Sequence, residues 1–299
     1  MINLSVVIPT KDREEDLLKC VGSIAKQALR PFEVLIIDDG HISDATKEKI
    51  KQGFSRSTIP VKYFKKKNPS SAESKNLGAK EASGQVVLFL DDDVVLRDDY
   101  TKNLIEAWER RWAEKKLAGI SGVITNSRKK SFSEKIFNII FCLYSKKSWS
   151  VLPWGFQTWD YHLKQEELAD WAPCGTTSFR KEIFDSYQFR PIQPGRVPLE
   201  DIEFSWQLNK DGYYFVISPL SELIHKESAG GRDGGFISGF KEGVSRKIIF
   251  RIHAEKGFKN RLYFCVSSFG WILRQFFAGH YSRGLGIIGG YFKGDKDYF

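Results

Sequence analysis

The sequence predicts an α/β fold in which a mostly parallel sheet is flanked by helices. Three apolar runs, at residues 4–9, 32–37 and 86–90, have the length and composition of buried strands. Segments with the apolar spacing of helices lie between them. Strands and helices that alternate in this way form parallel sheets through right-handed crossovers, with helices covering both faces.

The other elements follow from the same spacing. We expect strands at residues 4–9, 32–37, 61–64, 86–90, 119–125 and 215–217. We expect helices at residues 14–27, 44–54, 74–82 and 99–115, one that begins at Phe179 and Arg180, and one that follows Glu200 and Asp201 and ends before Asp211 and Gly212. Residues 126–171 are basic and aromatic with weak periodicity, which is typical of a mobile lid and equally of an aromatic satellite core.

Residues 86–93 (VVLFLDDD) join an apolar strand to three consecutive carboxylates. Ligands of open α/β sheets bind at such carboxyl ends. Adjacent carboxylates repel one another, so Asp91, Asp92 and Asp93 would be costly to desolvate without a cation. The run therefore predicts a divalent metal site, and the alternative is a solvated turn rich in Asp. Side chains alternate along an extended strand, so Asp92 should point away from the other two and be dispensable.

A second acidic pair, Asp38 and Asp39, follows the predicted strand at residues 32–37. The carboxyl ends of parallel strands share one edge of a sheet, so we expect both acidic groups to be neighbours in space. Two acidic strand ends at one edge are a stronger signal than either alone.

Phosphate-binding loops are missing from the first half of the sequence. No G-x-x-x-x-G-K-[ST] occurs, and no G-x-G-x-x-G follows the first strand. One such match, at Gly284, Gly286 and Gly289, follows no predicted strand, and we discount it. A metal at residues 91–93 is therefore the expected means of holding a diphosphate.

Composition indicates a globular protein with a positive surface. The 299 residues are 41% hydrophobic and 28% charged, which excludes a disordered chain. A net charge of +9 suits nucleic acid, anionic lipid or a phosphorylated substrate. The four cysteines are widely spaced, as in proteins of a reducing compartment. The sequence shows no secretory signal and no uninterrupted apolar stretch of ~20 residues, so we expect a cytoplasmic protein.

Six short motifs, in this order and spacing, resemble a known family. They are VVIPTKDR (6–13), VLIIDDG (34–40), AESKNLGAKEASG (72–84), FLDDDV (89–94), CGTTSFRKEIF (174–184) and PLEDIEFSWQL (198–208). The family is the inverting, nucleotide-sugar-dependent glycosyltransferases of family 2, and the resemblance extends over about residues 4–225. It implies a Rossmann-like GT-A fold at residues 1–228, with a nucleotide-sugar half at about 1–125 and an acceptor half at about 126–228. Residues 229–299 would form a basic, aromatic, helical C-terminal extension.

The resemblance implies that four positions of this sequence contact the nucleotide of the donor. Pro9, Thr10 and Asp39 match residues that line the base pocket, where the Asp accepts a hydrogen bond from a base N–H. Lys75 stands where the family usually has Arg. Its contact with ribose or phosphate would lack the bidentate fork of a guanidinium.

Three further positions resemble metal ligands. Asp91 and Asp93 match the D-x-D pair, with Asp93 the more direct ligand of Mn²⁺ or Mg²⁺ and Asp91 also on the nucleotide side. His225 resembles the third ligand of many GT-A enzymes, although a lone His is often structural.

On the acceptor side, Asp201 corresponds to the catalytic base, with Glu200 beside it. An acidic pair that only complements the helix dipole is the alternative. Gly175 and Thr176 match a segment where small residues let the acceptor approach the backbone, and a tight structural turn would explain them as well. Asp201 would take the proton of the acceptor hydroxyl in a single displacement, so no covalent intermediate is needed.

The implied function is inverting transfer of a sugar from a nucleotide-diphosphate donor, preferably a UDP-sugar, to an acceptor hydroxyl, with the metal neutralising the departing diphosphate. A sugar-phosphate nucleotidyltransferase would share the acidic sheet edge but needs a Gly-rich loop after the first strand, where this sequence has PTKDRE. A nucleic-acid-binding protein would explain the charge but not two acidic strand ends, so no nucleic acid is expected.

Residues 246–299 interleave Arg and Lys with Phe, Trp, Tyr and Ile, as in segments that lie in a membrane interface. We therefore expect peripheral contact with the anionic inner face of the cell membrane, and a lipid-linked or envelope-glycan acceptor. The alternative is that these helices pack on the catalytic domain or on a second subunit. Gly235, Gly239 and Gly243 would permit close helix contact.

Overall fold

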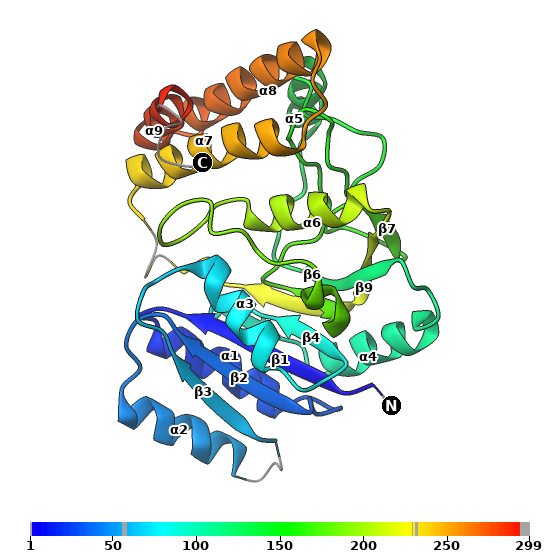
Figure 1. Cartoon of the computed structure of the whole chain (residues 1–299), viewed down its shortest axis with the longest axis vertical. Coiled ribbons are helices and arrows are strands. Elements are labelled where there is room, and N and C mark those ends of the chain that lie inside the picture. Colours follow the sequence, from blue (N-terminus) through cyan, green and yellow to red (C-terminus); the bar gives the residue numbers. More distant parts are fainter. Residues whose placement is uncertain (1, 56–58, 229, 231–232, 294–299) are drawn as a thin grey trace.

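The computed structural model describes residues 2–55, 59–228, 230 and 233–293 and has one large sheet with helices on both faces (Figure 1). The strand order is β3-β2-β1-β4-β8-β6-β9-β5, with β7 paired to β9. Two large apolar clusters, one on each face, bury the sheet. The predicted α/β class is confirmed, and the sheet is mixed.

The first part of the chain is a parallel α/β unit, as predicted. Its elements are β1 (Leu4–Thr10), α1 (Glu14–Ala25), β2 (Glu33–Asp38), α2 (Asp44–Phe54), β3 (Val61–Lys65), α3 (Ser71–Glu81) and β4 (Val86–Phe89). Ser43 and Ser70 cap α2 and α3 by accepting hydrogen bonds from backbone N–H groups of the first turns. Each of β1, β2 and β4 is almost wholly buried, because helices cover both faces.

The next part adds antiparallel strands to this sheet. Its elements are β5 (Val94–Leu96), α4 (Tyr100–Arg111), β6 (Leu117–Ile124), α5 (Phe132–Ile140), β7 (Glu167–Ala169), β8 (Thr177–Arg180), the 3₁₀ helix η1 (Lys181–Asp185), α6 (Glu200–Lys210) and β9 (Tyr214–His225). Strand β8 lies between β4 and β6 and is antiparallel to both. Four of the eight strand pairings in the described chain are parallel.

The helix predicted from Phe179 and Arg180 is wrong, because both residues belong to β8. Phe179 is fully buried and packs edge-on against Phe89 and Phe215. The Arg180 guanidinium donates to backbone carbonyls, among them that of Leu117 at 3.0 Å. The sequence TSFR of β8 contains Thr and Phe, which are enriched in strands, and its burial in the middle of the sheet fits that preference. Of the segment expected to form this helix, only the five residues of η1, directly after Arg180, are helical.

In residues 126–171 many aromatic side chains are packed, some in one of the two large apolar clusters of the sheet and others in a small separate cluster around Phe156. Trp149 is fully buried, and its ring lies 5.3 Å from that of Trp171 and 5.1 Å from that of Tyr161. Helix α5 begins with a complete capping box formed by Ser131 and Glu134.

The C-terminal region is helical, as predicted, with α7 (Gly235–His253), α8 (Phe258–Phe277) and α9 (Tyr281–Phe292). Residues 229, 231–232 and 294–299 of the predicted extension lie outside the described residues. A Cβ at Gly239 or Gly243 of α7 would collide with the α9 backbone, and one at Gly286 or Gly290 would collide with that of α7. The two helices are therefore in backbone contact through glycines. A Cβ at Gly235 would meet Ser282 and the Arg283 backbone only at ordinary van der Waals distance. The discounted Gly284–Gly289 match lies within α9.

Among the described residues, no helix is both long enough and apolar enough to cross a membrane.

Candidate active site

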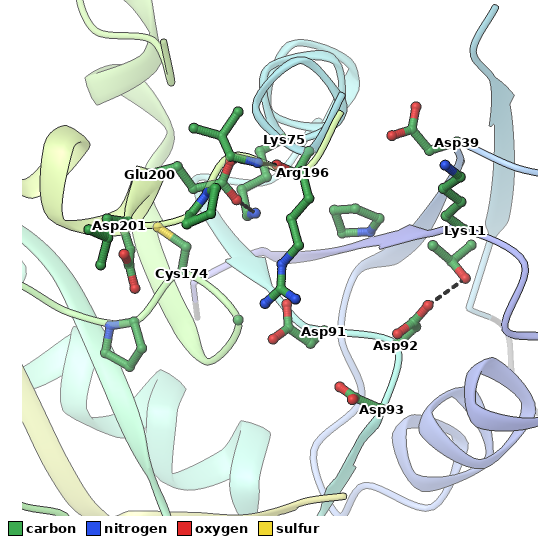
Figure 2. Close-up of a pocket in the computed structure, with 18 of the residues that line it drawn as sticks. Lys11, Asp39, Lys75, Asp91, Asp92, Asp93, Cys174, Arg196, Glu200 and Asp201 are labelled. Atoms are coloured by element: carbon green, nitrogen blue, oxygen red, sulfur yellow. Dashed lines mark hydrogen bonds and ion pairs between the residues drawn. The ribbon is translucent and has the colours of Figure 1, made fainter. Parts of the chain in front are cut away.

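A cavity of about 420 Å³ opens at the carboxyl ends of β1, β2 and β4 and extends to the start of α6 (Figure 2). All residues to which the sequence assigned a role in the site line this cavity: Pro9, Thr10, Asp39, Lys75, Asp91, Asp93, Gly175, Thr176, Glu200, Asp201 and His225. In Figure 2, Asp39 lies on one side, Glu200 and Asp201 on the other, and Asp91 to Asp93 between them. Segments more than 200 residues apart in the sequence, from Pro9 to His225, thus share one cavity.

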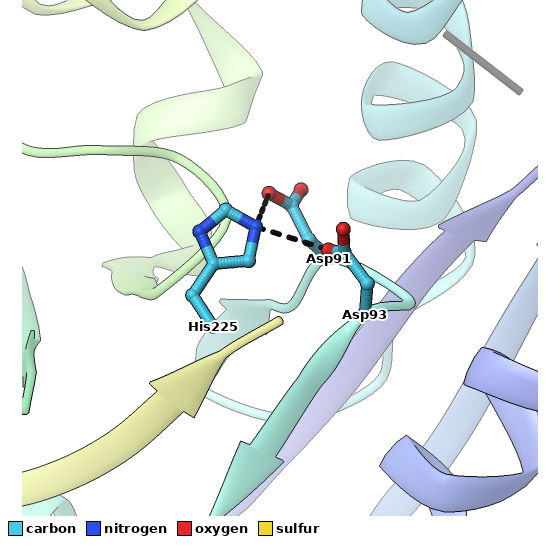
Figure 3. A group of neighbouring side chains, drawn as sticks. All are labelled: Asp91, Asp93 and His225. Carbon is cyan, nitrogen blue, oxygen red and sulfur yellow. Dashed lines mark hydrogen bonds and ion pairs between the residues drawn. The ribbon is translucent and has the colours of Figure 1, made fainter. Parts of the chain in front are cut away.

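Asp91, Asp93 and His225 form a compact group with one potential ligand atom each, all within 4.8 Å of one another (Figure 3). The Nε2 atom of His225 is 3.0 Å from Oδ1 of Asp93 and 3.9 Å from Oδ2 of Asp91. Strand pairing explains this, because Val94, next to Asp93, is opposite His225 in the antiparallel β5–β9 pair. Burial alone would lower the pKa of His225, but the hydrogen bond to Asp93 and the two carboxylate charges raise it. Two carboxylates and an imidazole are a donor set that suits Mn²⁺ or Mg²⁺.

Gly175 lies directly against Asp91. A Cβ on Gly175 would overlap the Asp91 carboxylate, and the Gly175 carbonyl accepts a 3.1 Å hydrogen bond from the Asp91 N–H. This residue, predicted to face the acceptor, therefore fixes the position of a metal-ligand candidate as well.

Asp92, which we expected to be dispensable, is buried and bonded, and the Nη1 atom of Arg13 that pairs with it also lies 3.4 Å from Oδ2 of Asp93. Asp92 accepts hydrogen bonds from Thr10 Oγ1 at 2.7 Å and from Arg13 Nη1 at 2.8 Å. Arg13 also donates to the carbonyls of Ser228 and Gly230, and the Ser228 N–H donates to Asp93. Asp92 thus anchors the arginine that joins β1 to the segment after β9.

Glu200 and Asp201 begin α6, directly after Leu199, whose φ of 65° is left-handed. A left-handed leucine is strained, and such residues are concentrated at functional sites. Burial, with a smaller contribution from the charge of Glu200, raises the pKa of Asp201 to about 6, although the hydrogen bond from the Ile202 N–H and the charge of Lys75 oppose the rise. Such a carboxyl is ionised near neutral pH and accepts protons more readily than an exposed one.

Lys75 forms a buried ion pair with Glu200, which also accepts a 2.8 Å hydrogen bond from Ser71 Oγ. The side chain that the sequence placed on the nucleotide is therefore bonded to an acceptor-side residue. Asp39, expected at the base, accepts from the Ser70 N–H at 2.8 Å and lies 3.0 Å from the Lys66 ammonium.

Known proteins resemble this chain in both sequence and structure. The model of glycosyl transferase family 2 matches residues 5–166, more than half of the chain. The chain belongs to this family.

Relatives of this family 2 member match it over about a third of its length. A Campylobacter jejuni protein named GalNAc(5)-diNAcBac-PP-undecaprenol beta-1,3-glucosyltransferase is 38% identical over 31% of this chain and 30% of its own. An uncharacterized glycosyltransferase of Rickettsia bellii is 38% identical over 30% of this chain. The matched segment spans only 13% of that relative's length. In two other glycosyltransferases, from Rickettsia conorii and Rickettsia felis, it spans 15% of the relative's length.

Solved structures with low sequence identity show that the fold is GT-A. GalNAc-T7 with UDP, GalNAc and Mn²⁺ aligns at a TM-score of 0.58 with 17% identity, over 75% of this chain and 44% of its own. The mannosyltransferase PcManGT of Pyrobaculum calidifontis, with GDP-Man and Mn²⁺, aligns at 0.57 with 14% identity, over 97% of this chain and 79% of its own.

The cavity of this family 2 chain also contains side chains that the sequence did not single out. Lys11, Tyr161, Arg196 and Lys241 line it, and Figure 2 shows Arg196 pointing across it toward Asp91. Lys11 lies in the PTKDR motif and could have been chosen from it. The other three lie in segments without a motif, and Lys241 comes from α7, beyond the predicted catalytic domain.

Proposed function

We propose that this protein is an inverting glycosyltransferase that moves a sugar from a nucleotide-diphosphate donor to an acceptor hydroxyl in the described cavity. One observation carries the proposal: the Asp91, Asp93 and His225 group and the Asp201 carboxylate line the same 420 Å³ cavity. A single displacement needs a base and stabilisation of the leaving group on opposite sides of the reacting carbon.

Asp201 is the proposed base, and the charges of Glu200 and Lys75 raise and lower its pKa. An Asp with a pKa of about 6 is ionised at neutral pH and binds the proton of the acceptor hydroxyl when attack occurs. The ion pair between Lys75 and Glu200 fixes the first turn of α6, and with it the Asp201 backbone. Gly175, which has no side chain, leaves room for the Asp91 carboxylate.

The Asp91, Asp93 and His225 group would hold the divalent cation, Mn²⁺ or Mg²⁺. When bound, such a cation supplies positive charge to the departing diphosphate. The cationic side chains of Lys11, Arg196 and Lys241, which line the same cavity, would hold the phosphate oxygens. Pro9, Thr10 and Asp39 would contact the base and, in this proposal, accept uracil.

The acceptor in this proposal is a lipid-linked or cell-envelope glycan. The Campylobacter relative, whose name contains PP-undecaprenol, supports this class of acceptor. Peripheral attachment to an anionic membrane surface belongs to the same proposal, and the cytoplasmic location expected from the sequence stays a prediction. The family match favours glycosyl transfer over the nucleotidyltransferase and nucleic-acid-binding alternatives.

Thermal denaturation with a panel of UDP- and GDP-sugars, each with and without Mn²⁺, tests the donor proposal. A ligand stabilises the folded state by mass action, by about 2.7 kcal/mol at a concentration of 100 Kd. We expect a UDP-sugar to raise the melting temperature in Mn²⁺ and to have little effect on the Asp93→Asn variant. Stabilisation by none of the nucleotide sugars would contradict the proposal, and stabilisation by GDP-sugars alone would contradict its choice of base.

A further inference from the structure

Two helices at one end of the molecule bury polar side chains and expose apolar ones, the reverse of the usual arrangement. In Figure 1, α8 runs along the top with α5 beside it, at the end opposite α2. The only buried residue of α5 is Asn138. The buried residues of α8 are Ser267, Ser268, Gly270 and Gln275. Small and polar side chains face inward here, whereas a helix of a water-soluble protein normally buries its apolar face.

Large apolar side chains of the same helices face outward. Six of them define the surface that we call the α5–α8 face: Phe132, Ile136, Ile139 and Ile140 of α5, and Phe269 and Phe277 of α8. Phe132 and Phe277 are each 78% exposed. At 3.6 residues per turn, the residues named on each helix fall within an arc of roughly 100°. Each helix thus presents one continuous apolar stripe to the outside.

Direct contacts hold the two stripes side by side. Phe137 of α5 lies 6.5 Å from Phe277, and Phe141 lies 6.1 Å from Phe269, between ring centroids. The hydroxyl of Ser267 donates to the carbonyl of Phe141 at 2.9 Å. The inward polar residues therefore bond the helices together, and the α5–α8 face is one surface rather than two separate helices.

The chain around this face is strongly basic. Residues 258–292 contain four basic residues and no Asp or Glu. Residues 126–147 contain six basic residues and a single acidic one, Glu134. An apolar patch flanked by charges of one sign fits a surface that is apolar inside and anionic at its boundary.

Two cations lie at the base of the face. The Arg274 guanidinium is over the rings of Phe137 and Trp271, each at 5.2 Å, and donates to Asn138. The Lys130 ammonium is 4.6 Å from the centre of the Trp159 ring. Burial lowers the pKa of both groups, as expected for cations that gain little from nearby acids. Both cations are bonded within the protein, so the charges available to an anionic surface are those of exposed basic residues of the two helices, among them Lys135 and Lys259.

We propose that the α5–α8 face docks on an anionic lipid bilayer, with its apolar side chains in the acyl boundary and the exposed Lys135 of α5 and Lys259 of α8 near the lipid phosphates. This deepens the membrane attachment named in the proposed function but does not depend on the chemistry in the cavity. The sequence pointed to residues 246–299 alone. The face instead combines α8 with α5, which comes from within the predicted catalytic domain.

Vesicle co-sedimentation tests the proposal directly. The full chain is mixed with phosphatidylglycerol-rich vesicles or with purely phosphatidylcholine vesicles. We expect binding to the former only, and at least a roughly tenfold weaker affinity for the Ile140→Asp, Phe277→Asp double variant. The control is Leu220→Asp, which changes an equally apolar side chain, 63% exposed on β9 outside the face, and should bind like the wild type. Thermal melting verifies that each variant is folded.

A label on Cys265 reports insertion independently of affinity. Cys265 is exposed on α8, whereas Cys20 and Cys174 are buried, and Cys142→Ser removes the partly exposed thiol. A polarity-sensitive fluorophore on Cys265 should shift its emission to the blue when anionic vesicles are added. Three outcomes would overturn the proposal: equal binding of the double variant and the wild type, equal binding to phosphatidylcholine vesicles, or dimers in solution that the double variant dissociates without any binding to vesicles.

Discussion

The Lys75 ammonium forms a buried ion pair with Glu200, the residue that precedes Asp201 at the start of α6. The pair connects α3, which belongs to the parallel half of the sheet, to the helix that carries the proposed base. The two charges act on Asp201 in opposite directions, since Lys75 lowers its pKa and Glu200 raises it. Neutralising each partner separately should therefore have opposite effects on the base.

We predict that Lys75→Met moves the acidic limb of the kcat/KM profile to higher pH and that Glu200→Gln moves it to lower pH. Lys75→Met also leaves Glu200 buried without its partner, which should cost about 3–5 kcal/mol of stability. The double variant should recover part of this loss. pH–rate profiles measure the shift of the acidic limb, and urea denaturation measures the stability. If the acidic limbs of both single variants moved in the same direction, the pair would not control the pKa of Asp201.

The pKa of Asp201 predicts how activity and stability depend on pH. Below about pH 6 the rate should fall roughly tenfold per pH unit, because the base becomes protonated. Because the folded pKa is above the ordinary value of 3.8, the folded state binds this proton more tightly, and its contribution to stability is lost as pH rises from about 4 through about 6. Asp201→Asn should melt higher than the wild type at pH 7 and nearly equally at pH 3, and a lower melting temperature at pH 7 would refute this.

Gly175→Ala should weaken Mn²⁺ binding at least tenfold, because the new methyl group displaces the Asp91 carboxylate. Gly22→Ala is the matched control, since nothing lies within 4 Å of a Cβ at Gly22, which is in α1. Titration calorimetry with Mn²⁺ measures both variants. Wild-type affinity in Gly175→Ala would mean that Asp91 is not a ligand.

We predict that Asp92 has a structural role and that Asp93 binds the metal. Asp92→Ala removes the nearer of the two carboxylates that pair with Arg13 and should lower the free energy of unfolding by about 3 kcal/mol while Mn²⁺ affinity changes little. Asp93→Ala should abolish Mn²⁺ binding. Asp44→Ala, at a carboxylate with a 97% exposed side chain, controls for charge removal and should be near neutral. Full stability of Asp92→Ala would restore the expectation that this residue is dispensable.

The sequence predicts elements and site well where a local signal exists. The apolar strands of the first half, each followed by acids or a turn, indicated the shared edge where Asp39, Asp91 and Asp93 lie. His225 could be paired with Asp93 only through motif order, and the β5–β9 pairing supplies the physical reason.

Where distant contacts decide, the sequence predicts less. Phe179 and Arg180 form a strand because β4 and β6 flank them, and neither strand is close in sequence. Lys241 reaches the cavity only because α9 holds α7 through glycine contacts and α7 begins beside the site. The reversed polarity of α5 and α8 is hidden in the sequence, because apolar periodicity does not say which side of a helix faces outward.

The central claim is that Asp201 and the Asp91, Asp93 and His225 group catalyse glycosyl transfer together. Its most direct test is the rate at which Mn²⁺-dependent UDP release from a UDP-sugar occurs in the wild type and in Asp201→Asn. We expect release by the wild type and a rate roughly 10²- to 10⁴-fold lower in Asp201→Asn, with donor affinity retained. Equal rates in both proteins, or no release from any nucleotide sugar with Mn²⁺ or Mg²⁺, would contradict the claim.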